Sequence, residues 1–307
     1  MSVTSTSPFG RTVCAMVTPF APDGTLDLDG AQLLADHLVT HGRCDGLVLN
    51  GTTGESPTTS DEEKTRLVRA VAEAVGGRAR IVAGVGTADT GQSAALAAAA
   101  QRAGAHGVLV VTPYYSRPPQ EDVEAHFRTV ADAVTIPVML YDIPGRTGTR
   151  IEPATLLRLA GHPGIAGVKD CAYDLLSSSR IIAETPLAYY SGVEELNLPL
   201  RAVGAAGYVS TVANVAGPLL AALLDAYDRG DTAAATALHQ RALPLVTAMM
   251  ASGLPGTVTA KALLNARGLP AGPVRAPLRA AGEERTAALL AAYEHAMAHE
   301  DDLAPAR

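Results

Sequence analysis

Short apolar segments alternate with stretches of helical periodicity along the first two thirds of the chain. The apolar segments are continuous rather than alternating, which is typical of strands buried on both faces of a parallel sheet. Eight can be recognised, at Val13–Thr18, Gly46–Asn50, Arg80–Gly86, Gly107–Thr112, Ile136–Asp142, Gly164–Lys169, Leu187–Ser191 and Gly207–Val212. No further strand-like segment follows Asn214.

The segments between these strands carry helix start and stop signals. Ser60 and Glu63 have the spacing of a capping box, and Asp27 is a suitable N-cap for a helix that ends at Gly42. The regular alternation of strand and helix predicts a (β/α)8 TIM barrel, in the α/β class. The alternative is a doubly wound open sheet, which is disfavoured because no G-x-G-x-x-G follows the first strand.

The remainder of the chain predicts a helical extension of the barrel. Residues 216–251 and 281–299 are rich in Ala and Leu and predict helices, with a shorter helix at Thr257–Arg267 between them. We therefore expect a barrel with the active site over residues 1–231 and a C-terminal helical domain over residues 232–307.

Composition limits the possible partners and compartments. The net charge of −7 argues against nucleic acid as a partner. The chain lacks an apolar run of the ~18 residues that a membrane span needs, and its first 11 residues lack the apolar core of a secretory signal. The cysteines, Cys14, Cys44 and Cys171, are odd in number and lack metal-ligand spacing, which favours a reduced, cytoplasmic protein without a bound metal. Cys171 is interpreted as a small apolar filler.

Lys169 ends the sixth apolar segment and is the first candidate for chemistry. The chain has 24 basic residues, but only Lys64, Lys169 and Lys261 are lysines. Arginine therefore serves wherever a positive charge is sufficient. A lysine amine can form a Schiff base with a ketone, which a guanidinium cannot do. Position alone favours an exposed strand-end lysine, so the other strand ends must decide.

In barrels of this type the catalytic residues lie at the C-terminal ends of the strands. The second strand leads into residues 51–56, GTTGES, whose glycines and hydroxyl groups suit a small carboxylate. The other strands lead to Tyr114-Tyr115, to Tyr141 and Arg146, to Ser191-Gly192 and to Ala213-Asn214. Each feature alone fits an ordinary turn or a packing residue. Together they place an amine, phenols, hydroxyl groups and a guanidinium on one rim.

These motifs, in this order, resemble the dihydrodipicolinate synthase / N-acetylneuraminate lyase family of class I aldolases. The resemblance extends from about Val13 to about Arg279. Residues 51–55 resemble the pyruvate-carboxylate loop of the family, and Tyr141 with Lys169 resembles its Tyr–Lys pair. Arg146 in the segment YDIPGRTG resembles the synthase branch, because lyase branches usually carry an apolar residue there.

The resemblance implies Schiff-base chemistry without a metal or an organic cofactor. Lys169 would condense with pyruvate, and the resulting enamine would attack L-aspartate 4-semialdehyde. The product would be 4-hydroxy-tetrahydrodipicolinate, an intermediate of lysine and diaminopimelate biosynthesis. Tyr141 would act as acid and base on the imine, and Thr53 would link it to Tyr115 in a proton relay.

The resemblance also implies the binding residues and the assembly. Thr52 and Thr53 would hold the pyruvate carboxylate, and Arg146 would hold the carboxylate of the second substrate. The backbone carbonyls of Gly192 and Val209 would face the site. Tyr115 would reach the active site of a neighbouring subunit, which implies a homodimer, usually paired into a homotetramer.

Two departures from the family pattern leave alternatives open. Val193-Glu194 stands where synthases carry Asp-Asp, so a carboxylate beside the pocket is displaced or lost. Ala88 and Gln92 replace the Asn and Glu of members that are inhibited by lysine, so we expect weak feedback or none. One alternative is a paralogous pyruvate aldolase or lyase with another acceptor. The other is a catalytically silent barrel that binds a keto acid.

Overall fold

The computed structural model describes residues 7–298 and 303. Predictions for the first six residues, and for most of the chain after residue 298, lie outside this part. In the described residues, eight parallel strands pair in sequence order and β8 pairs with β1, which closes a barrel. The strands are β1 Thr12–Ala15, β2 Gly46–Leu49, β3 Arg80–Gly84, β4 Gly107–Val111, β5 Val138–Asp142, β6 Ile165–Asp170, β7 Ala188–Ser191 and β8 Gly207–Ser210.

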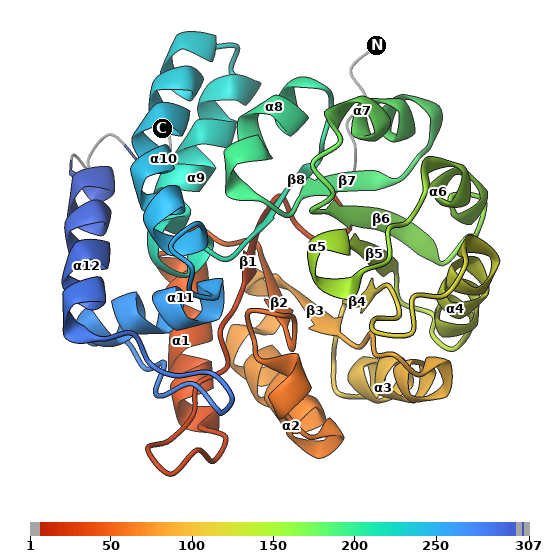
Figure 1. The fold of residues 1–307 in the computed structure, drawn as a ribbon, viewed down its shortest axis with the longest axis horizontal. Helices are drawn as coiled ribbons and strands as arrows, with labels where there is room; N and C mark the ends of the chain where they lie inside the picture. Colours follow the sequence, from red (N-terminus) through yellow and green to blue (C-terminus); the bar gives the residue numbers. More distant parts are fainter. Residues whose placement is uncertain (1–6, 299–302, 304–307) are drawn as a thin grey trace.

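Helices surround the barrel and extend beyond it (Figure 1). They are α1 Leu28–Thr40, α2 Asp61–Val75, α3 Thr90–Arg102, α4 Gln120–Asp132, α5 Pro144–Thr147, α6 Pro153–Leu159, α7 Leu175–Glu184, α8 Asn197–Ala202, α9 Ala213–Asp228, α10 Thr232–Met250, α11 Gly256–Ala266 and α12 Glu283–Met297. Three short 3-10 helices are η1 Ser56–Thr58, η2 Gly76–Arg78 and η3 Glu194–Leu196. The predicted (β/α)8 barrel with a C-terminal helical extension is confirmed.

The predicted helix caps form as the local sequence indicates. The Ser60 hydroxyl accepts from the Glu63 N–H at 3.1 Å, and the Glu63 carboxylate accepts from the Ser60 N–H at 2.8 Å, which completes the capping box of α2. The Asp27 carboxylate accepts from the Gly30 N–H at 2.8 Å and caps α1, which ends at Thr40 rather than at Gly42.

Successive residues of each strand point alternately into the barrel and toward the helices. On β4, Val108 and Val110 belong to the outer core, whereas Leu109 belongs to the interior core. On β6 the same period turns Val168 outward and Lys169 inward, where its ammonium meets the ring of Tyr141. The alternation of side chains along β6 is therefore sufficient to place Lys169 in the barrel interior.

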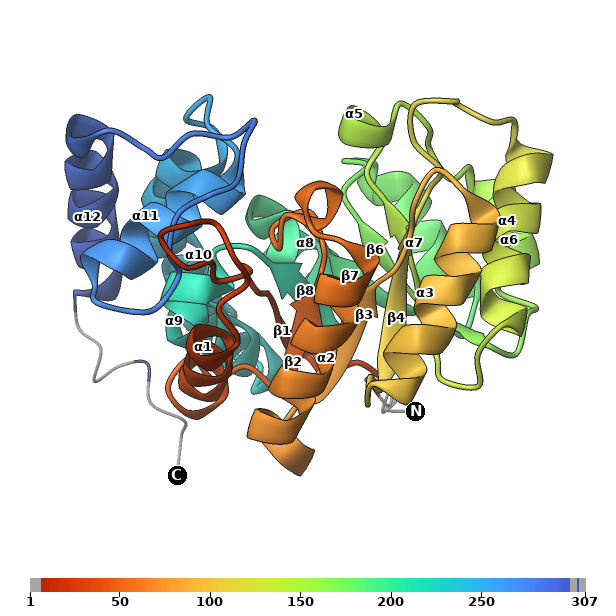
Figure 2. The same cartoon turned by 90° about the horizontal axis from the view of Figure 1, so that it is seen from below.

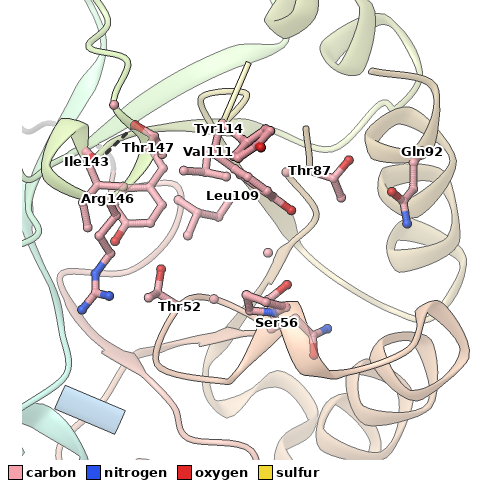
Figure 3. Close-up of a pocket in the computed structure, with 18 of the residues that line it drawn as sticks. Thr52, Ser56, Thr87, Gln92, Leu109, Val111, Tyr114, Ile143, Arg146 and Thr147 are labelled. Atoms are coloured by element: carbon pink, nitrogen blue, oxygen red, sulfur yellow. Dashed lines mark hydrogen bonds between the residues drawn. The ribbon is translucent and has the colours of Figure 1, made fainter. Parts of the chain in front are cut away.

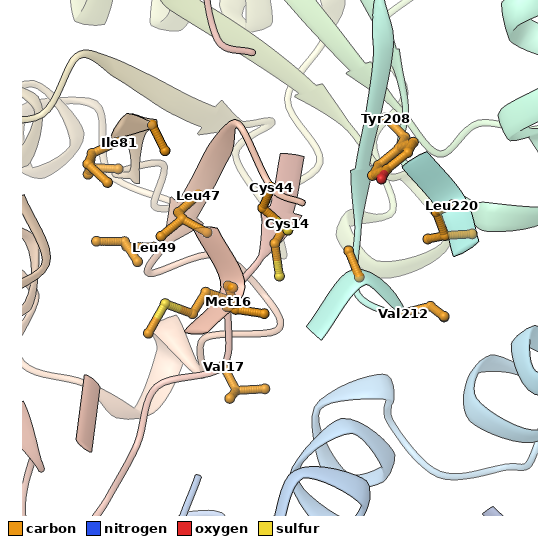
Figure 4. Close-up of a cluster of buried hydrophobic side chains, with 14 of the residues drawn as sticks. Cys14, Met16, Val17, Cys44, Leu47, Leu49, Ile81, Tyr208, Val212 and Leu220 are labelled. Atoms are coloured by element: carbon orange, nitrogen blue, oxygen red, sulfur yellow. The ribbon is translucent and has the colours of Figure 1, made fainter. Parts of the chain in front are cut away.

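The outer core lies between the strands and the helices. Figure 4 shows part of it, with Cys14 of β1 beside Cys44 and with Leu47 and Tyr208 from neighbouring strands. All three cysteines are free and buried. Cys14 and Cys44 therefore behave as small apolar side chains of this layer.

Phe9 fills the end of the barrel opposite the strand termini that carry the candidate site. Its side chain has no exposed surface, and its ring meets that of Tyr190 edge-on with a centroid distance of 6.0 Å. A Cβ atom at Gly107 or Gly167 would lie 2.8 or 3.1 Å from carbons of the Phe9 ring. Both strands need glycine there because the aromatic ring occupies the space of a side chain.

The C-terminal helices gather beside α1 and α9 on one side of the barrel (Figures 1 and 2). The predicted helical region 216–251 consists of two helices, because Gly230 adopts a left-handed conformation (φ 83°) between α9 and α10. Helix α9 contacts β1 and β8, and α10 packs on α9 and α12. The domain division after residue 231 falls in this turn and stays a prediction. None of the helices in the described residues has the length and apolar character needed to cross a lipid bilayer.

We predict that Phe9→Ala lowers the free energy of unfolding by about 3–5 kcal/mol, because it removes a buried ring and leaves a cavity. Leu33→Ala is the matched control, since Leu33 is 66% exposed on α1 and should change stability by less than about 0.5 kcal/mol. Urea unfolding followed by circular dichroism measures both. Equal effects of the two substitutions would contradict the role of Phe9.

Candidate active site

A cavity of about 800 Å³ opens at the C-terminal ends of the strands. Residues from several strand ends line it, among them Thr52, Tyr115, Tyr141 and Arg146. Figure 3 shows Arg146 and Thr52 near one end of the cavity and Gln92 at the other. Four of the residues predicted from sequence therefore share one cavity, although they are widely separated along the chain.

Lys169 lies in the barrel interior beside this cavity and is only 6% exposed. Its Nζ atom is 4.3 Å from the centroid of the Tyr141 ring, and β5 and β6 pair these two residues directly. Burial lowers the pKa of the Lys169 ammonium, and the Arg146 guanidinium acts in the same direction. A lower pKa increases the neutral fraction of the amine near neutral pH, which is the form that attacks a ketone.

Tyr141 is equally buried, and burial raises the pKa of its phenol well above the usual value. The Thr52 side chain acts in the opposite direction and lowers the pKa of the phenol. The phenol therefore stays protonated in the resting site and can donate a proton to a neighbouring oxygen or nitrogen.

The two threonines of the loop after β2 point to different places. The Thr53 hydroxyl lies 2.8 Å from the hydroxyl of Thr211 and is buried there, while Thr52 interacts with Tyr141 and lines the cavity. This differs from the predicted Thr53 link between Tyr141 and Tyr115. Adjacent residues of a tight turn project in different directions, and the sequence alone could not decide which hydroxyl faces the phenol.

Arg146 belongs to α5, a single turn that follows β5. Gly148 ends this turn in a left-handed conformation (φ 69°), and the Thr147 hydroxyl donates to the Ile143 carbonyl at 3.1 Å (Figure 3). The Arg146 side chain is exposed at the cavity. It is therefore placed to meet a ligand group that enters from solvent.

Tyr115 also lines the cavity, but its side chain is 95% exposed. Its backbone is left-handed (φ 72°), an unfavourable conformation for a non-glycine residue. A large aromatic side chain held outward at this cost indicates a function for the exposed ring.

Gly192 and Val209 are not among the residues that line the cavity. Val209 contributes its side chain to the interior core. The Gly192 carbonyl accepts a hydrogen bond from the Cys171 thiol at 3.2 Å, and a Cβ atom at Gly192 would lie 2.9 Å from Cε of Lys169. Burial raises the pKa of the Cys171 thiol to about 12, which fits the predicted filler rather than a nucleophile. Sequence analysis missed this thiol as a partner of the Gly192 carbonyl.

Glu194 supplies the carboxylate that the segment Val193-Glu194 was expected to displace or lose after β7. Its carboxylate is buried and accepts from the Ser210 hydroxyl at 2.7 Å and from the Thr211 and Val212 N–H groups at 2.8 and 3.0 Å. The carboxylate is therefore retained, but it braces the turn after β8 instead of lining the cavity. Its negative charge opposes the fall in the pKa of Lys169.

Two buried carboxylates directly follow Tyr141 and Lys169 and were not singled out from the sequence. Asp142 accepts from the Ile151 N–H at 3.1 Å, and burial raises its pKa to about 7. Asp170 accepts from the hydroxyls of Ser178 and Tyr189 at 2.6 and 2.7 Å. Both carboxylates face the helices and anchor the ends of β5 and β6. Within the described residues, no cluster of three or more His, Cys, Asp or Glu side chains is arranged to hold a metal ion.

Gln92, one of the two positions associated with feedback, lines the far end of the cavity together with Asp61 and Lys64. The Gln92 amide donates to both carboxylate oxygens of Asp61, at 3.1 and 3.2 Å. The Lys64 ammonium donates to the Thr59 carbonyl at 2.6 Å. The Gln92 amide and the Lys64 ammonium therefore both have partners within the protein.

The sequence and the fold match one family. The model of the dihydrodipicolinate synthetase family matches residues 8–296. The chain is 69% identical over 287 residues to 4-hydroxy-tetrahydrodipicolinate synthase 1 of Streptomyces coelicolor, which covers 94% of both chains. It is 57% identical over 283 residues to the 4-hydroxy-tetrahydrodipicolinate synthase of Acidothermus cellulolyticus, covering 92% and 91%.

Solved structures of dihydrodipicolinate synthases have the same fold as this chain. Dihydrodipicolinate synthase of Bacillus anthracis superposes with a TM-score of 0.90 at 36% identity, covering 93% of this chain and 98% of that one. The enzyme of Cyanidioschyzon merolae with lysine bound gives a TM-score of 0.91 at 36% identity, covering 94% and 98%. The chain belongs to the dihydrodipicolinate synthetase family.

Proposed function

We propose that this protein condenses pyruvate with L-aspartate 4-semialdehyde to 4-hydroxy-tetrahydrodipicolinate, a step of lysine and diaminopimelate biosynthesis. The observation that carries the proposal is the buried Lys169 ammonium over the Tyr141 ring, beside a cavity that Thr52 and Arg146 line. The names of the relatives support it. The lysine itself is the covalent catalyst, so the reaction needs no metal or organic cofactor.

The first half of the reaction forms an imine. The neutral amine of Lys169 adds to the ketone carbon of pyruvate, and the resulting carbinolamine loses water. Tyr141 supplies the proton that the departing hydroxyl needs. The Thr52 hydroxyl and the N–H groups of Thr52 and Thr53 hold the pyruvate carboxylate.

The second half forms the carbon–carbon bond and the ring. The imine loses a proton from its methyl group and becomes an enamine, whose terminal carbon attacks the aldehyde of the semialdehyde. The amino group of the adduct then attacks the imine carbon, displaces Lys169 and closes a six-membered ring. The lysine amine is regenerated, and the one water released came from imine formation.

We assign the hydroxyl next to Tyr141 in the proton relay to Thr52, because Thr52 interacts with the Tyr141 phenol and Thr53 bonds Thr211 instead. The next member of the relay is Tyr115 of a second subunit. Its 95% exposure and strained backbone support a role outside its own subunit. The proposed assembly is a homodimer, paired into a homotetramer.

Arg146 selects the acceptor. Its guanidinium offers a two-pronged hydrogen-bond donor at the cavity mouth, which suits an aldehyde that carries its own carboxylate. This favours the semialdehyde over the uncharged acceptor of a paralogous aldolase. The buried Lys169 and Tyr141 pair argues against a silent keto-acid-binding barrel, since binding alone does not need a desolvated amine. The free, buried cysteines support a cytoplasmic location.

We predict that pyruvate with borohydride labels Lys169 and neither Lys64 nor Lys261. Peptide mass mapping locates the added mass. Lys169→Arg should be as inactive as Lys169→Ala, because a guanidinium forms no imine. Labelling at another lysine would contradict the mechanism.

We predict that Tyr115 acts in the active site of the partner subunit. Mixtures of Tyr115→Phe and Lys169→Ala subunits should regain activity, because one site of each hybrid dimer then holds both native residues. Steady-state assays after subunit exchange, with native mass spectrometry to demonstrate hybrids, measure this. Inactive hybrids would show that Tyr115 serves its own subunit or none.

We predict that Arg146→Ala weakens transition-state binding of aspartate 4-semialdehyde by about 1.5–3 kcal/mol, the contribution of a hydrogen bond to a charged group. The ratio kcat/KM for the semialdehyde and for an uncharged aldehyde measures the effect, which should be confined to the charged acceptor. A wild-type preference for uncharged aldehydes would favour the paralogous aldolase.

A further inference from the structure

Helix α11 of the C-terminal extension lies directly against the loop that carries Thr52 and Thr53. Thr257 and Lys261 are four residues apart and therefore share one face of this helix. The Thr257 hydroxyl lies 3.2 Å from the Thr53 carbonyl and 3.4 Å from the Thr52 carbonyl, and donates between them. Thr257 itself is 4% exposed.

The second contact from this face is a buried ion pair. Nζ of Lys261 lies 2.7 Å from Oε1 of Glu55, and both side chains are 2% exposed. The same ammonium donates to the Pro273 carbonyl at 2.7 Å and lies 4.3 Å from the centroid of the Phe20 ring. A compact ammonium with three donors suits these three directions, which the planar fork of arginine does not.

Glu55 ends the loop, and its conformation needs outside support. Its backbone is left-handed (φ 57°), which is unfavourable for a glutamate. Its second carboxylate oxygen accepts from the Arg275 N–H at 2.8 Å, and the Arg275 guanidinium bonds Glu63 and the Thr58 carbonyl on the barrel side. The loop is thus held from the extension at both threonine carbonyls and at its terminal carboxylate.

A buried ion pair contributes little net stability, because desolvation of the two charges offsets their attraction. An apolar pair would fill the same space at no greater cost. What the Glu55–Lys261 pair adds is a fixed position, because neither buried charge can move away without leaving the other uncompensated. It fixes the backbone of the loop more narrowly than apolar packing would.

We propose that Thr257 and the Lys261–Glu55 pair are positioning residues, through which the C-terminal extension sets the affinity of the loop for the pyruvate carboxylate. This inference rests on the proposed function, in which the loop holds that carboxylate. None of the three residues lines the cavity. They act through the main chain of Thr52 and Thr53.

The test uses the full-length protein and measures how the imine trapped by borohydride at Lys169 depends on pyruvate concentration. The Glu55→Gln/Lys261→Met double variant removes both charges, so no charge is left buried without a partner. Thr257→Val removes only the hydroxyl, and Thr257→Ser keeps it. Intact-protein mass spectrometry measures the trapped fraction.

We expect the double variant and Thr257→Val to raise the half-saturating pyruvate concentration about tenfold, a factor that corresponds to ~1.4 kcal/mol. The trapped fraction at saturating pyruvate and the KM for the semialdehyde should stay within about twofold, since only ground-state binding of pyruvate weakens. Thr257→Ser should retain wild-type half-saturation. If the double variant does not fold, the comparison of Thr257→Val with Thr257→Ser tests the inference by itself.

Asp225→Asn is the control for a general loss of stability. Asp225 pairs with Arg11 and Arg43, away from the loop. The variant should lower the Tm and leave half-saturation unchanged. Unchanged half-saturation in the loop variants, or an equal rise in Asp225→Asn, would overturn the inference. Failure of wild-type protein to trap pyruvate at Lys169 would instead refute the proposed function.

Discussion

The site depends on keeping one lysine amine out of water. Lys169 is inward-facing at the end of β6, and the resulting desolvation lowers the pKa of its ammonium so that a reactive neutral amine is available. The same burial raises the pKa of the Tyr141 phenol and keeps its proton available for donation. One physical effect therefore prepares both groups, in opposite directions, because it disfavours the charged form of each.

Two charged groups also act on the pKa of Lys169, in opposite directions. Glu194 places a buried negative charge near Lys169, while Arg146 at the cavity acts against the ammonium. The Glu194 carboxylate is held by three donors at the turn after β8, so its position is fixed. Although Val193 carries no carboxylate, Glu194 next to it does, and that carboxylate has a structural role.

The barrel and the extension contribute differently to the site. Strand register places Lys169 and Tyr141 side by side, and this part is determined once the barrel closes. The loop after β2 has no such register, and two of its residues, Asn50 and Glu55, adopt left-handed conformations. It is held instead by contacts from far along the chain, notably from α11. This gives a physical reason for the helices beyond the barrel to matter for binding.

The sequence by itself determined the eight strands, their order and the residues at their C-terminal ends, because strand burial and turn chemistry are local signals. It also placed Lys169 at the C-terminal end of the sixth strand, but it did not decide whether the side chain faces the barrel interior or solvent. Only the tertiary structure decided that the Thr53 hydroxyl pairs with Thr211 while Thr52 lines the cavity, that Glu194 braces β8, and that Lys261 pairs with Glu55. These partners are far apart in sequence, up to 206 residues for the last pair. The direction of each side chain in a tight turn depends on the distant parts of the fold that pack against the turn. A local sequence pattern does not contain that information.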